Sequence, residues 1–403
     1  MWSRMLPALL CAALLAACSR PISLEGAFMA LAAPAPRVTV LAPQADWTNY
    51  ELFDDSRIFL PGRINGREAP VMLDSGASMT TVDSAFAAQL GLKPGMSLPV
   101  KGAVGSVDAK LMKGVTLEVG GVRLEKMTVL VVDLSSVARQ IGHPMPIILG
   151  REVFETLIAD LDLPNRRLAF RPRDGWTPPA GAIRLPLTVS ADGQRSFAIA
   201  LEGRPPVQAH FDLGNGGALF LRPGYWQGLD LLKDRQSSMT LTGGVGGLKP
   251  APILTLRGLD IGGVRLANVP TVLSPAGGGD AAKANVGFAV LSRFHILTDY
   301  RGGSLYLLAD PAAKDRPFRR NRSGLGTFPA GDRQRVVLVA PGSPAAAAGW
   351  KFGEEILAVD GTPLGPNAAA SPLTRWSSGS AGETHSLTLA DGSVRKLTLA
   401  DYF

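Results

Sequence analysis

Short apolar stretches that end at turn residues run along most of the chain and predict strands. Residues 58–64 and 69–73 are apolar runs on either side of Asn65-Gly66, a dipeptide typical of a tight β-hairpin turn. A short helix is predicted over residues 84–90, because Asp83 can cap its amino terminus and Gly91 can end it. The pattern as a whole predicts a mainly β protein.

The pattern of the first half recurs in the second half at a nearly constant offset. The recurring features are unlike one another, which makes chance a poor explanation and predicts two copies of one β-rich lobe. The corresponding features are Asp74 and Asp212 (138 residues apart), Gly150 and Gly287 (137), Asp162 and Asp299 (137), and residues 120–124 and 262–266 (142).

Two of the recurring features place an aspartate directly after an apolar strand. Residues 71–80 read V-M-L-D-S-G-A-S-M-T, and residues 209–215 read A-H-F-D-L-G-N. A single D-S-G is more often a turn in which the aspartate caps its own loop. Two aspartates presented in the same way favour one site built from two halves, with Asp74 and Asp212 as its candidate catalytic residues.

Glycine-bearing segments recur between the strands of the two lobes. The first, G-A-V-G-S-V, contains Gly105, and the second, G-G-V-G-G, contains Gly246. We expect both segments to be mobile hairpins that close over the site as flaps.

A pair of facing carboxylates can hydrolyse a peptide bond without a metal or a nucleophilic side chain. Two like charges in close proximity share one proton, so one carboxylate can act as general base on a water while the other protonates the scissile carbonyl. The mature chain has no G-x-S-x-G motif, no phosphate loop and no cysteine near a histidine. We expect no cofactor and no metal, since metal-ligand spacing is absent among His143, His210, His295 and His385.

Composition and charge narrow the class of protein further. The 403 residues include 46% hydrophobic and 19% charged residues, with 46 glycines and 31 prolines, which is typical of a turn-rich globular protein of two or three domains. The net charge of +7 comes from scattered Lys and Arg. Their densest cluster, residues 316–322, is interpreted as a solvated linker, so we expect no nucleic-acid partner.

The amino terminus has the features of a secretory signal. Residues 1–17 contain Arg4, an apolar core and small residues before Cys18, and they are too short to span a membrane. Leu15-Ala16-Ala17-Cys18 resembles a bacterial lipobox, which implies lipidation of Cys18; ordinary cleavage near Ala17 is the alternative. Ser19 resembles the sorting residue of outer-membrane lipoproteins. The expected location is the periplasmic side of the envelope, with an Ala- and Pro-rich tether over residues 18–45.

The last part of the chain differs from both lobes. Residues 341–345 read P-G-S-P-A, and G-W-K-F-G-E-E-I-L-A-V-D-G-T-P-L follows. This pattern resembles a bacterial PDZ domain. The resemblance implies that such a domain binds C-terminal peptides, with its carboxylate-binding loop at Gly324, Leu325, Gly326 and Thr327.

The aspartate motifs also carry a resemblance to a known family. D-S-G-A at residues 74–77 and I-L-G at residues 148–150 resemble the paired signatures of retropepsin-like aspartic proteases. Two such lobes followed by a PDZ domain resemble a group of bacterial envelope proteins classed as aspartyl proteases. The resemblance implies an endopeptidase acting on peptide or protein substrates, with Ser75, Gly76 and Gly214 supporting the dyad.

The second lobe departs from that pattern. The family has Ser or Thr after each aspartate, but Leu213 stands after Asp212, and N-V-G at residues 285–287 replaces I-L-G. Either the dyad is asymmetric, with Asp212 in a drier setting and its pKa raised, or the second half has decayed and the protein binds peptides without cutting them. A third hypothesis is an intermolecular dimer in which Asp74 faces Asp74.

Together these observations predict a pepsin- or retropepsin-like bilobal fold with a C-terminal PDZ domain. The expected boundaries are a signal peptide over 1–17, the tether over 18–45, lobes over 46–173 and 180–312, and the PDZ domain over 320–403.

Overall fold

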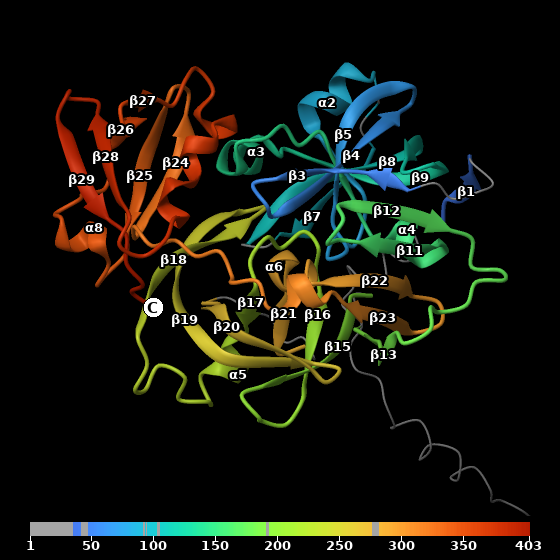
Figure 1. Cartoon of the computed structure of the whole chain (residues 1–403). Helices are drawn as coiled ribbons and strands as arrows, with labels where there is room; N and C mark the ends of the chain where they lie inside the picture. Colours follow the sequence, from blue (N-terminus) through green and yellow to red (C-terminus); the bar gives the residue numbers. More distant parts are fainter. Residues whose placement is uncertain are drawn as a thin grey trace, which may run out of the picture.

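The computed structural model describes residues 35–41, 47–91, 93, 95–102, 105–190, 193–275 and 282–403. These residues form four β-sheets with short helices between the strands, which confirms the mainly β fold class. Figure 1 shows the first lobe in blue and teal, the second in green and yellow, and the C-terminal unit in orange and red. The helices are α2 (Ser84–Gln89), α3 (Ser135–Ile141), α4 (Glu152–Thr156), α5 (Pro223–Trp226), α6 (Phe288–Leu291), α7 (Pro311–Lys314), α8 (Pro344–Ala347), η1 (Ala368–Ala370) and η2 (Pro372–Ser378).

The first lobe is built on a nine-stranded sheet. Its strands are β1 (Arg37–Val40), β3 (Glu51–Phe53), β4 (Arg57–Ile64), β5 (Arg67–Leu73), β6 (Thr81–Asp83), β7 (Ser97–Lys101), β8 (Ser106–Val119), β9 (Val122–Val132) and β10 (Ile147–Leu149). β4 and β5 form the expected hairpin, and Asn65 and Gly66 both have positive φ at its turn. Asp83 caps α2 by accepting from the backbone N–H groups of Ala85 and Phe86.

The second lobe repeats the strand order of the first within an eight-stranded sheet. Its strands are β14 (Thr188–Val189), β15 (Arg195–Leu201), β16 (Val207–Phe211), β17 (Leu219–Leu221), β18 (Ser237–Gly244), β19 (Gly247–Ile261), β20 (Val264–Leu273) and β21 (Ala284–Val286). β10 runs parallel to β5 and antiparallel to β6, and β21 runs in the same way beside β16 and β17. The described strands therefore repeat in topology as well as in sequence.

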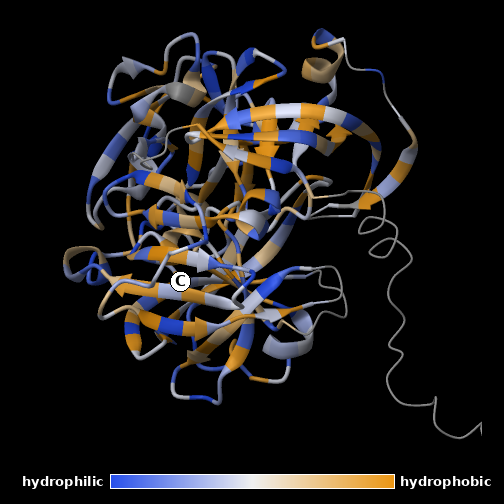
Figure 2. Cartoon of the chain, turned by 90° about the vertical axis from the view of Figure 1, so that its right-hand side faces the viewer, coloured by the Kyte–Doolittle hydropathy of each residue, from blue (hydrophilic) through white to orange (hydrophobic). Residues whose placement is uncertain are grey.

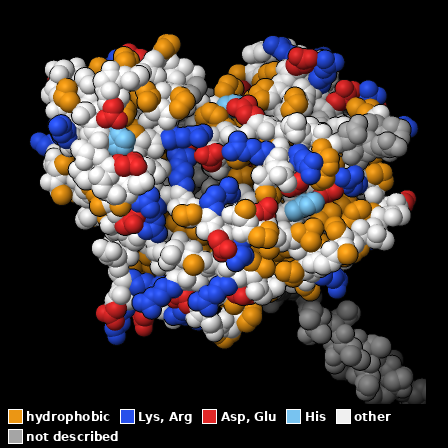
Figure 3. Space-filling model, viewed as in Figure 1, with side chains coloured by type: hydrophobic (Ala, Val, Ile, Leu, Met, Phe, Trp, Pro, Cys, Tyr) orange, Lys and Arg blue, Asp and Glu red, His pale blue; other side chains and the backbone are white. Residues whose placement is uncertain are grey.

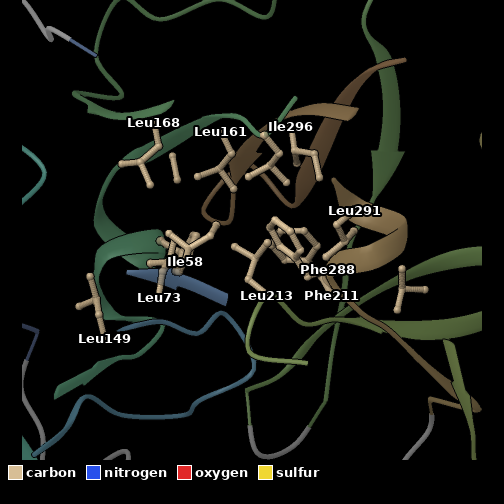
Figure 4. Packing of buried hydrophobic residues seen from close by; sticks show 14 of the residues in the cluster. Ile58, Leu73, Leu149, Leu161, Leu168, Phe211, Leu213, Phe288, Leu291 and Ile296 are labelled. Carbon is tan, nitrogen blue, oxygen red and sulfur yellow. The ribbon is translucent and has the colours of Figure 1, made fainter. Parts of the chain in front are cut away.

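A six-stranded sheet joins the two lobes. It consists of β13 (Ile183–Pro186), β23 (Ser304–Ala309), β22 (Phe294–Asp299), β11 (Ile158–Asp162), β12 (Arg167–Arg171) and β2 (Thr48–Asn49), in that order. Residues of both lobes and of this sheet belong to one continuous hydrophobic core. Figure 4 shows Leu73 of the first lobe and Leu213 of the second on either side of the centre of this core, below Leu161 of the joining sheet. Figure 2 shows the alternation of apolar and polar residues along the strands.

The C-terminal unit has a sheet and a core of its own. The strands are β24 (Leu325–Ala330), β25 (Arg333–Val339), β26 (Glu355–Val359), β27 (Thr362–Pro363), β28 (Thr384–Leu389) and β29 (Val394–Thr398). The final residues, Tyr402 and Phe403, are buried and pack with Ala340 against Ile253 of the second lobe. This contact fixes the unit to β19.

The basic cluster at residues 316–322 is not a solvated linker, contrary to the sequence-based interpretation. Arg319 pairs with Asp54 of the first lobe at 2.7 Å. Arg320 donates to Thr255 Oγ1 of the second lobe at 2.6 Å and to the backbone oxygen of Phe403 at 3.2 Å. These arginines bind the units to each other, because each reaches an acceptor that a folded lobe presents.

The expected extent of the tether also needs correction. The tether was expected to reach residue 45, but β1 pairs antiparallel with β9 of the first lobe, because Val38 and Val40 alternate with polar residues and pack on the core. Residues 106–119 form the single strand β8, whose pairing with β9 shifts in register around Gly114 (φ 76°). The predicted signal peptide and Cys18 lie outside the described residues.

Candidate functional site

The two aspartates are delivered by equivalent strands. Asp74 follows β5, and its backbone N–H donates to the carbonyl oxygen of Leu149 in β10 at 3.0 Å. Asp212 follows β16, and its N–H donates to the carbonyl oxygen of Val286 in β21 at 3.2 Å. In each lobe a parallel neighbour thus holds the end of the strand that carries the aspartate.

The loops that follow the aspartates meet face to face. A Cβ atom added at Gly76 would lie 2.7 Å from Oδ1 of Asp212, and one added at Gly214 would collide with the carboxylate of Asp74. Only glycine leaves room for each carboxylate to lie against the opposite loop. Asp74, Gly76, Asp212 and Gly214, which were predicted separately, are brought together within one chain.

Asp74 is held by its own loop and lies in an environment that disfavours its charge. Oδ1 accepts from the N–H groups of Gly76 at 2.8 Å and Ala77 at 3.1 Å. Burial, followed by the negative charge of Asp212, raises the pKa of Asp74 to about 7, against the lowering effects of the two N–H donors and of Arg57. The pair can therefore keep a shared proton up to nearly neutral pH.

Asp212 accepts a hydrogen bond on each of its oxygens. Oδ1 accepts from the backbone N–H of Asn215 at 3.0 Å, and Oδ2 accepts from the side-chain amide of Asn285 at 2.6 Å. Amide N–H groups therefore hold both oxygens of Asp212, whereas burial raises the pKa of Asp74. Asn285 was not predicted as a site residue, although the N-V-G sequence had marked its position as unusual.

Ser75 links the two loops. Its Oγ donates to the carbonyl oxygen of Phe211 at 3.0 Å and accepts from the N–H of Leu213 at 2.9 Å. Leu213 has no hydroxyl to return this bond, and its side chain is fully buried in the shared core (Figure 4). Hydrogen bonds of the Ser75 hydroxyl therefore link the first loop to the second, whereas the side chain of Leu213 contributes only apolar packing in the opposite direction.

Arg57 is a second residue that sequence reasoning missed. It begins β4, and a Cβ atom at Gly216 of the second aspartate loop would collide with its guanidinium. Burial lowers the pKa of Arg57, while Asp74, Asp54 and Asp212 oppose that effect. The site thus contains a cation close to both carboxylates, for which the aspartate motifs give no signal.

The dyad lines a cavity of about 2140 Å³. Gly105 and Gly246 lie at the turns of the β7–β8 and β18–β19 hairpins, with φ of 80° and 101°. A Cβ atom at Gly102 would meet the carbonyl oxygen of Val245, and Val245 packs against the same buried apolar cluster as Leu98 and Val100. The two hairpins therefore meet each other. Figure 3 shows a hollow between the units with Lys and Arg side chains around it.

The predicted carboxylate-binding loop lies on the same cavity, which Gly324, Gly326 and Thr327 line. However, the N–H of Gly324 donates to Asn321 Oδ1 at 3.0 Å, and the N–H of Leu325 donates to Ser323 Oγ at 3.0 Å. Because these donors already have acceptors inside the chain, they do not point toward a peptide carboxylate. The sequence motif of the loop gave no indication that Asn321 and Ser323 accept the hydrogen bonds of its N–H groups.

The described part of the chain contains no group of three His, Cys, Asp or Glu side chains placed to hold a metal ion. No helix within the same residues has the length and apolar character needed to cross a membrane.

Comparison with known proteins gives one informative match. Residues 60–153, which carry Asp74 and its neighbours, match the family described as "Aspartyl protease". No curated protein sequence matches the chain. Among solved structures, basic 7S globulin from soybean aligns with a TM-score of 0.42 and 10% identity over 68% of this chain and all of that one. Conglutin gamma from lupine seeds aligns with a TM-score of 0.40 and 11% identity over 70% of this chain and all of that one. The family match supports an aspartyl-protease-like function.

Proposed function

We propose that the chain is an aspartic-type endopeptidase in which Asp74 and Asp212 activate one water molecule. The observation that carries this proposal is the crossing of the two aspartate loops, in which Gly76 lies against Asp212 and Gly214 against Asp74. This crossing brings two carboxylates of one chain together at a cavity, the arrangement that the reaction requires.

The reaction needs the pair to carry one proton. The ionised carboxylate takes a proton from the water as the water oxygen bonds to the scissile carbonyl carbon, and the protonated carboxyl gives its proton to the carbonyl oxygen. The resulting diol collapses when the C–N bond breaks: the nitrogen takes the proton now held by the base, and a diol hydroxyl returns its proton to the other carboxylate. The sum is one peptide bond and one water converted to an acid and an amine, with the dyad restored.

The expected activity extends to nearly neutral pH. Since burial raises the pKa of Asp74 to about 7, the shared proton is lost only as the pH rises through that value. We expect the basic side of the pH profile to fall near pH 7, which suits an enzyme of the periplasm.

The cavity would bind an extended peptide between the lobes. Its volume of about 2140 Å³ and the meeting of the β7–β8 and β18–β19 hairpins over it support flaps that open for substrate. The C-terminal unit would contact the peptide along the cavity wall at Gly326 and Thr327. This differs from capture of a free carboxylate by Gly324 and Leu325, whose N–H groups are occupied.

We also propose that the mature chain is a lipoprotein anchored at Cys18 on the periplasmic side of the outer membrane. Labelling with a radioactive fatty acid in cells tests this, since Cys18→Ser should remove the label and release the chain. Label retained by Cys18→Ser would refute the anchor without touching the proposed chemistry.

The catalytic proposal is tested by incubating the purified chain with a mixed peptide library from pH 4 to pH 8 and identifying products by mass spectrometry. Asp74→Asn and Asp212→Asn should each abolish cleavage. Asp174→Asn, at an exposed aspartate in the segment between the two lobes, is the matched control and should cut normally. Full cleavage by Asp74→Asn would refute the proposal.

Two alternatives have distinct outcomes in the same experiment. If the chain binds peptides but cuts none at any pH, it is a binding protein. Leu213, which replaces the Ser or Thr of the family, favours this alternative. A dimer with Asp74 facing Asp74 requires activity in Asp212→Asn and dimeric behaviour in solution. The contact of Gly214 with Asp74 within one chain supports the monomeric dyad.

A further inference from the structure

A chain of three amide hydrogen bonds ends on Asp212. The backbone N–H of Gly217 donates to Asn215 Oδ1 at 2.9 Å. Asn215 Nδ2 then donates to Asn285 Oδ1 at 2.7 Å, and Asn285 Nδ2 donates to Asp212 Oδ2 at 2.6 Å. The chain crosses from the aspartate loop to β21 and returns to the aspartate.

The direction of these bonds follows from their starting point. A side-chain amide can be turned over, which exchanges its oxygen and nitrogen, so its orientation must come from its partners. The backbone N–H of Gly217 can only donate, which fixes the oxygen of Asn215 toward it. The nitrogen of Asn215 then faces the oxygen of Asn285, and the nitrogen of Asn285 faces Asp212. Asp212 Oδ2 must therefore accept.

The first lobe offers no such arrangement to Asp74. Ile148 holds the middle position of β10, which corresponds to Asn285 in β21, and its side chain has no donor. Both hydrogen bonds to Asp74 fall on Oδ1, and within the described residues none reaches Oδ2. Asp74 therefore has one oxygen that can carry a proton without displacing a donor, whereas both oxygens of Asp212 already accept.

We propose that Asn285, oriented by Asn215, is a positioning residue that holds Asp212 as the carboxylate and leaves the shared proton on Oδ2 of Asp74. The assignment of protonation stands on hydrogen-bond geometry alone. The assignment of catalytic roles rests on the proposed function: Asp212 is the base that takes the proton from water, and Asp74 is the acid that protonates the carbonyl oxygen. As the C–N bond breaks, Asp212 gives its proton to the leaving nitrogen, and a hydroxyl of the diol returns a proton to Asp74.

The other charged groups near the pair fit this assignment. Arg57 lies at the start of β4 and acts on both carboxylates. Tyr300 follows β22, and burial raises the pKa of its hydroxyl so far that it stays protonated at any pH at which the dyad titrates. The charges of Arg195, Glu155, Asp212 and Arg151 have smaller effects on that pKa. Glu155 is itself paired with Arg195 at 2.8 Å, so it brings little net charge. None of these groups supplies Asp74 Oδ2 with a donor, and burial raises the pKa of Asp74.

Carboxyl-carbon NMR of the full chain labelled at the aspartate Cγ tests the protonation without requiring any activity. Asp74→Asn and Asp212→Asn identify the two signals by their disappearance. Near pH 6, we expect the Asp212 signal at a carboxylate position and the Asp74 signal at a protonated position. A protonated Asp212 signal beside an ionised Asp74 would overturn the proposal, even if the chain cuts peptides.

Variants of Asn285 test the relay itself. Asn285→Leu makes the second lobe resemble the first. It should raise the pH at which the Asp212 signal changes from its protonated to its carboxylate position by about one unit or more, the size expected for the loss of one charge-assisted hydrogen bond. Asn285→Gln keeps an amide and should recover part of the shift. Asn215→Leu should move the signal in the same direction, because Asn285 then loses its fixed orientation.

If the chain cuts peptides, the same variants separate positioning from folding. Asn285→Leu should move the acidic side of the kcat profile to higher pH with little change in KM, whereas a folding defect lowers activity equally at every pH. Unchanged NMR signals and an unchanged pH profile in Asn285→Leu would refute the relay. An absence of cleavage with the expected NMR shifts would refute the proposed function and keep the relay.

Discussion

Replacing Asp74 with asparagine should stabilise the protein, and only at neutral and basic pH. The new side-chain amide would keep the Oδ1 acceptor for the two loop N–H groups and would place a permanent N–H donor where Asp74 Oδ2 carries a proton. Folding raises the pKa of this carboxyl from the ordinary 3.8 to about 7. The stability that the protonated carboxyl contributes is therefore complete below pH 3.8 and is lost as the pH rises through 7.

The pKa difference sets the size of the effect. About three pH units at 1.36 kcal/mol each give about 4 kcal/mol, an upper value because Asp212 shares the titration. Asparagine cannot ionise, so the variant escapes this loss. At pH 8.5 it should unfold at a temperature higher by up to about 5 °C, while at pH 3.5 the two proteins should unfold together.

Thermal unfolding followed by tryptophan fluorescence at both pH values measures the difference. Asp108→Asn is the control, since its exposed side chain should give the same small change at both. A variant that is less stable than the native protein at pH 8.5, or one whose advantage is equal at both pH values, would show that Asp74 does not hold a proton in the folded state.

Three further predictions follow from the packing of the site and of the second lobe. Gly214→Ala should lower kcat by about 100-fold, because the added methyl group displaces the carboxyl group of Asp74. Gly224→Ala is the control and should leave kcat unchanged, because its methyl group would contact no other atom. Equal losses of kcat in a peptidase assay would contradict this prediction. Ser75→Ala should lose about 1–3 kcal/mol of unfolding free energy in urea with its two interlobe hydrogen bonds, and Ser75→Thr should retain most of it. The hydrogen bond from Arg235 lowers the pKa of Glu202 to about 2, which sets an upper limit of about 3 kcal/mol on the cost of Glu202→Gln at pH 7; solvent screening should reduce this cost. The cost should disappear as the pH falls from 4.5 to 2, and a cost that is independent of pH in the same urea assay would rule out the ion pair as its source.

Local patterns predicted what depends on neighbours in sequence. The hairpin at Asn65 forms because its turn residues adopt positive φ at little cost, and Asp83 caps α2 because its carboxylate reaches N–H groups two and three residues ahead. Strand alternation also carried the signal of β1, in Val38 and Val40, but the low-complexity sequence around them concealed it.

The role of the basic cluster could not be predicted locally. Arg319 and Arg320 have the same side chain and nearly the same position in sequence, but one pairs with the first lobe and the other with the second. Which acceptor each reaches depends on how the C-terminal unit sits on both lobes. The occupied loop at Gly324 is a similar case, since its hydrogen bonds to Asn321 and Ser323 depend on the bend between them.

The sequence by itself determined that the chain is mainly β and that it carries two aspartates after equivalent strands, because hydrophobic periodicity and turn residues act over a few positions. It also marked Leu213 and Asn285 as departures from the first lobe. Only the tertiary structure decided what the departures mean: Leu213 fills the shared core, and Asn285 donates to Asp212. Parallel pairing of β16 with β21 brings residues 73 positions apart into hydrogen-bonding distance, and the direction of those bonds depends on Gly217, Asn215 and Asn285 together.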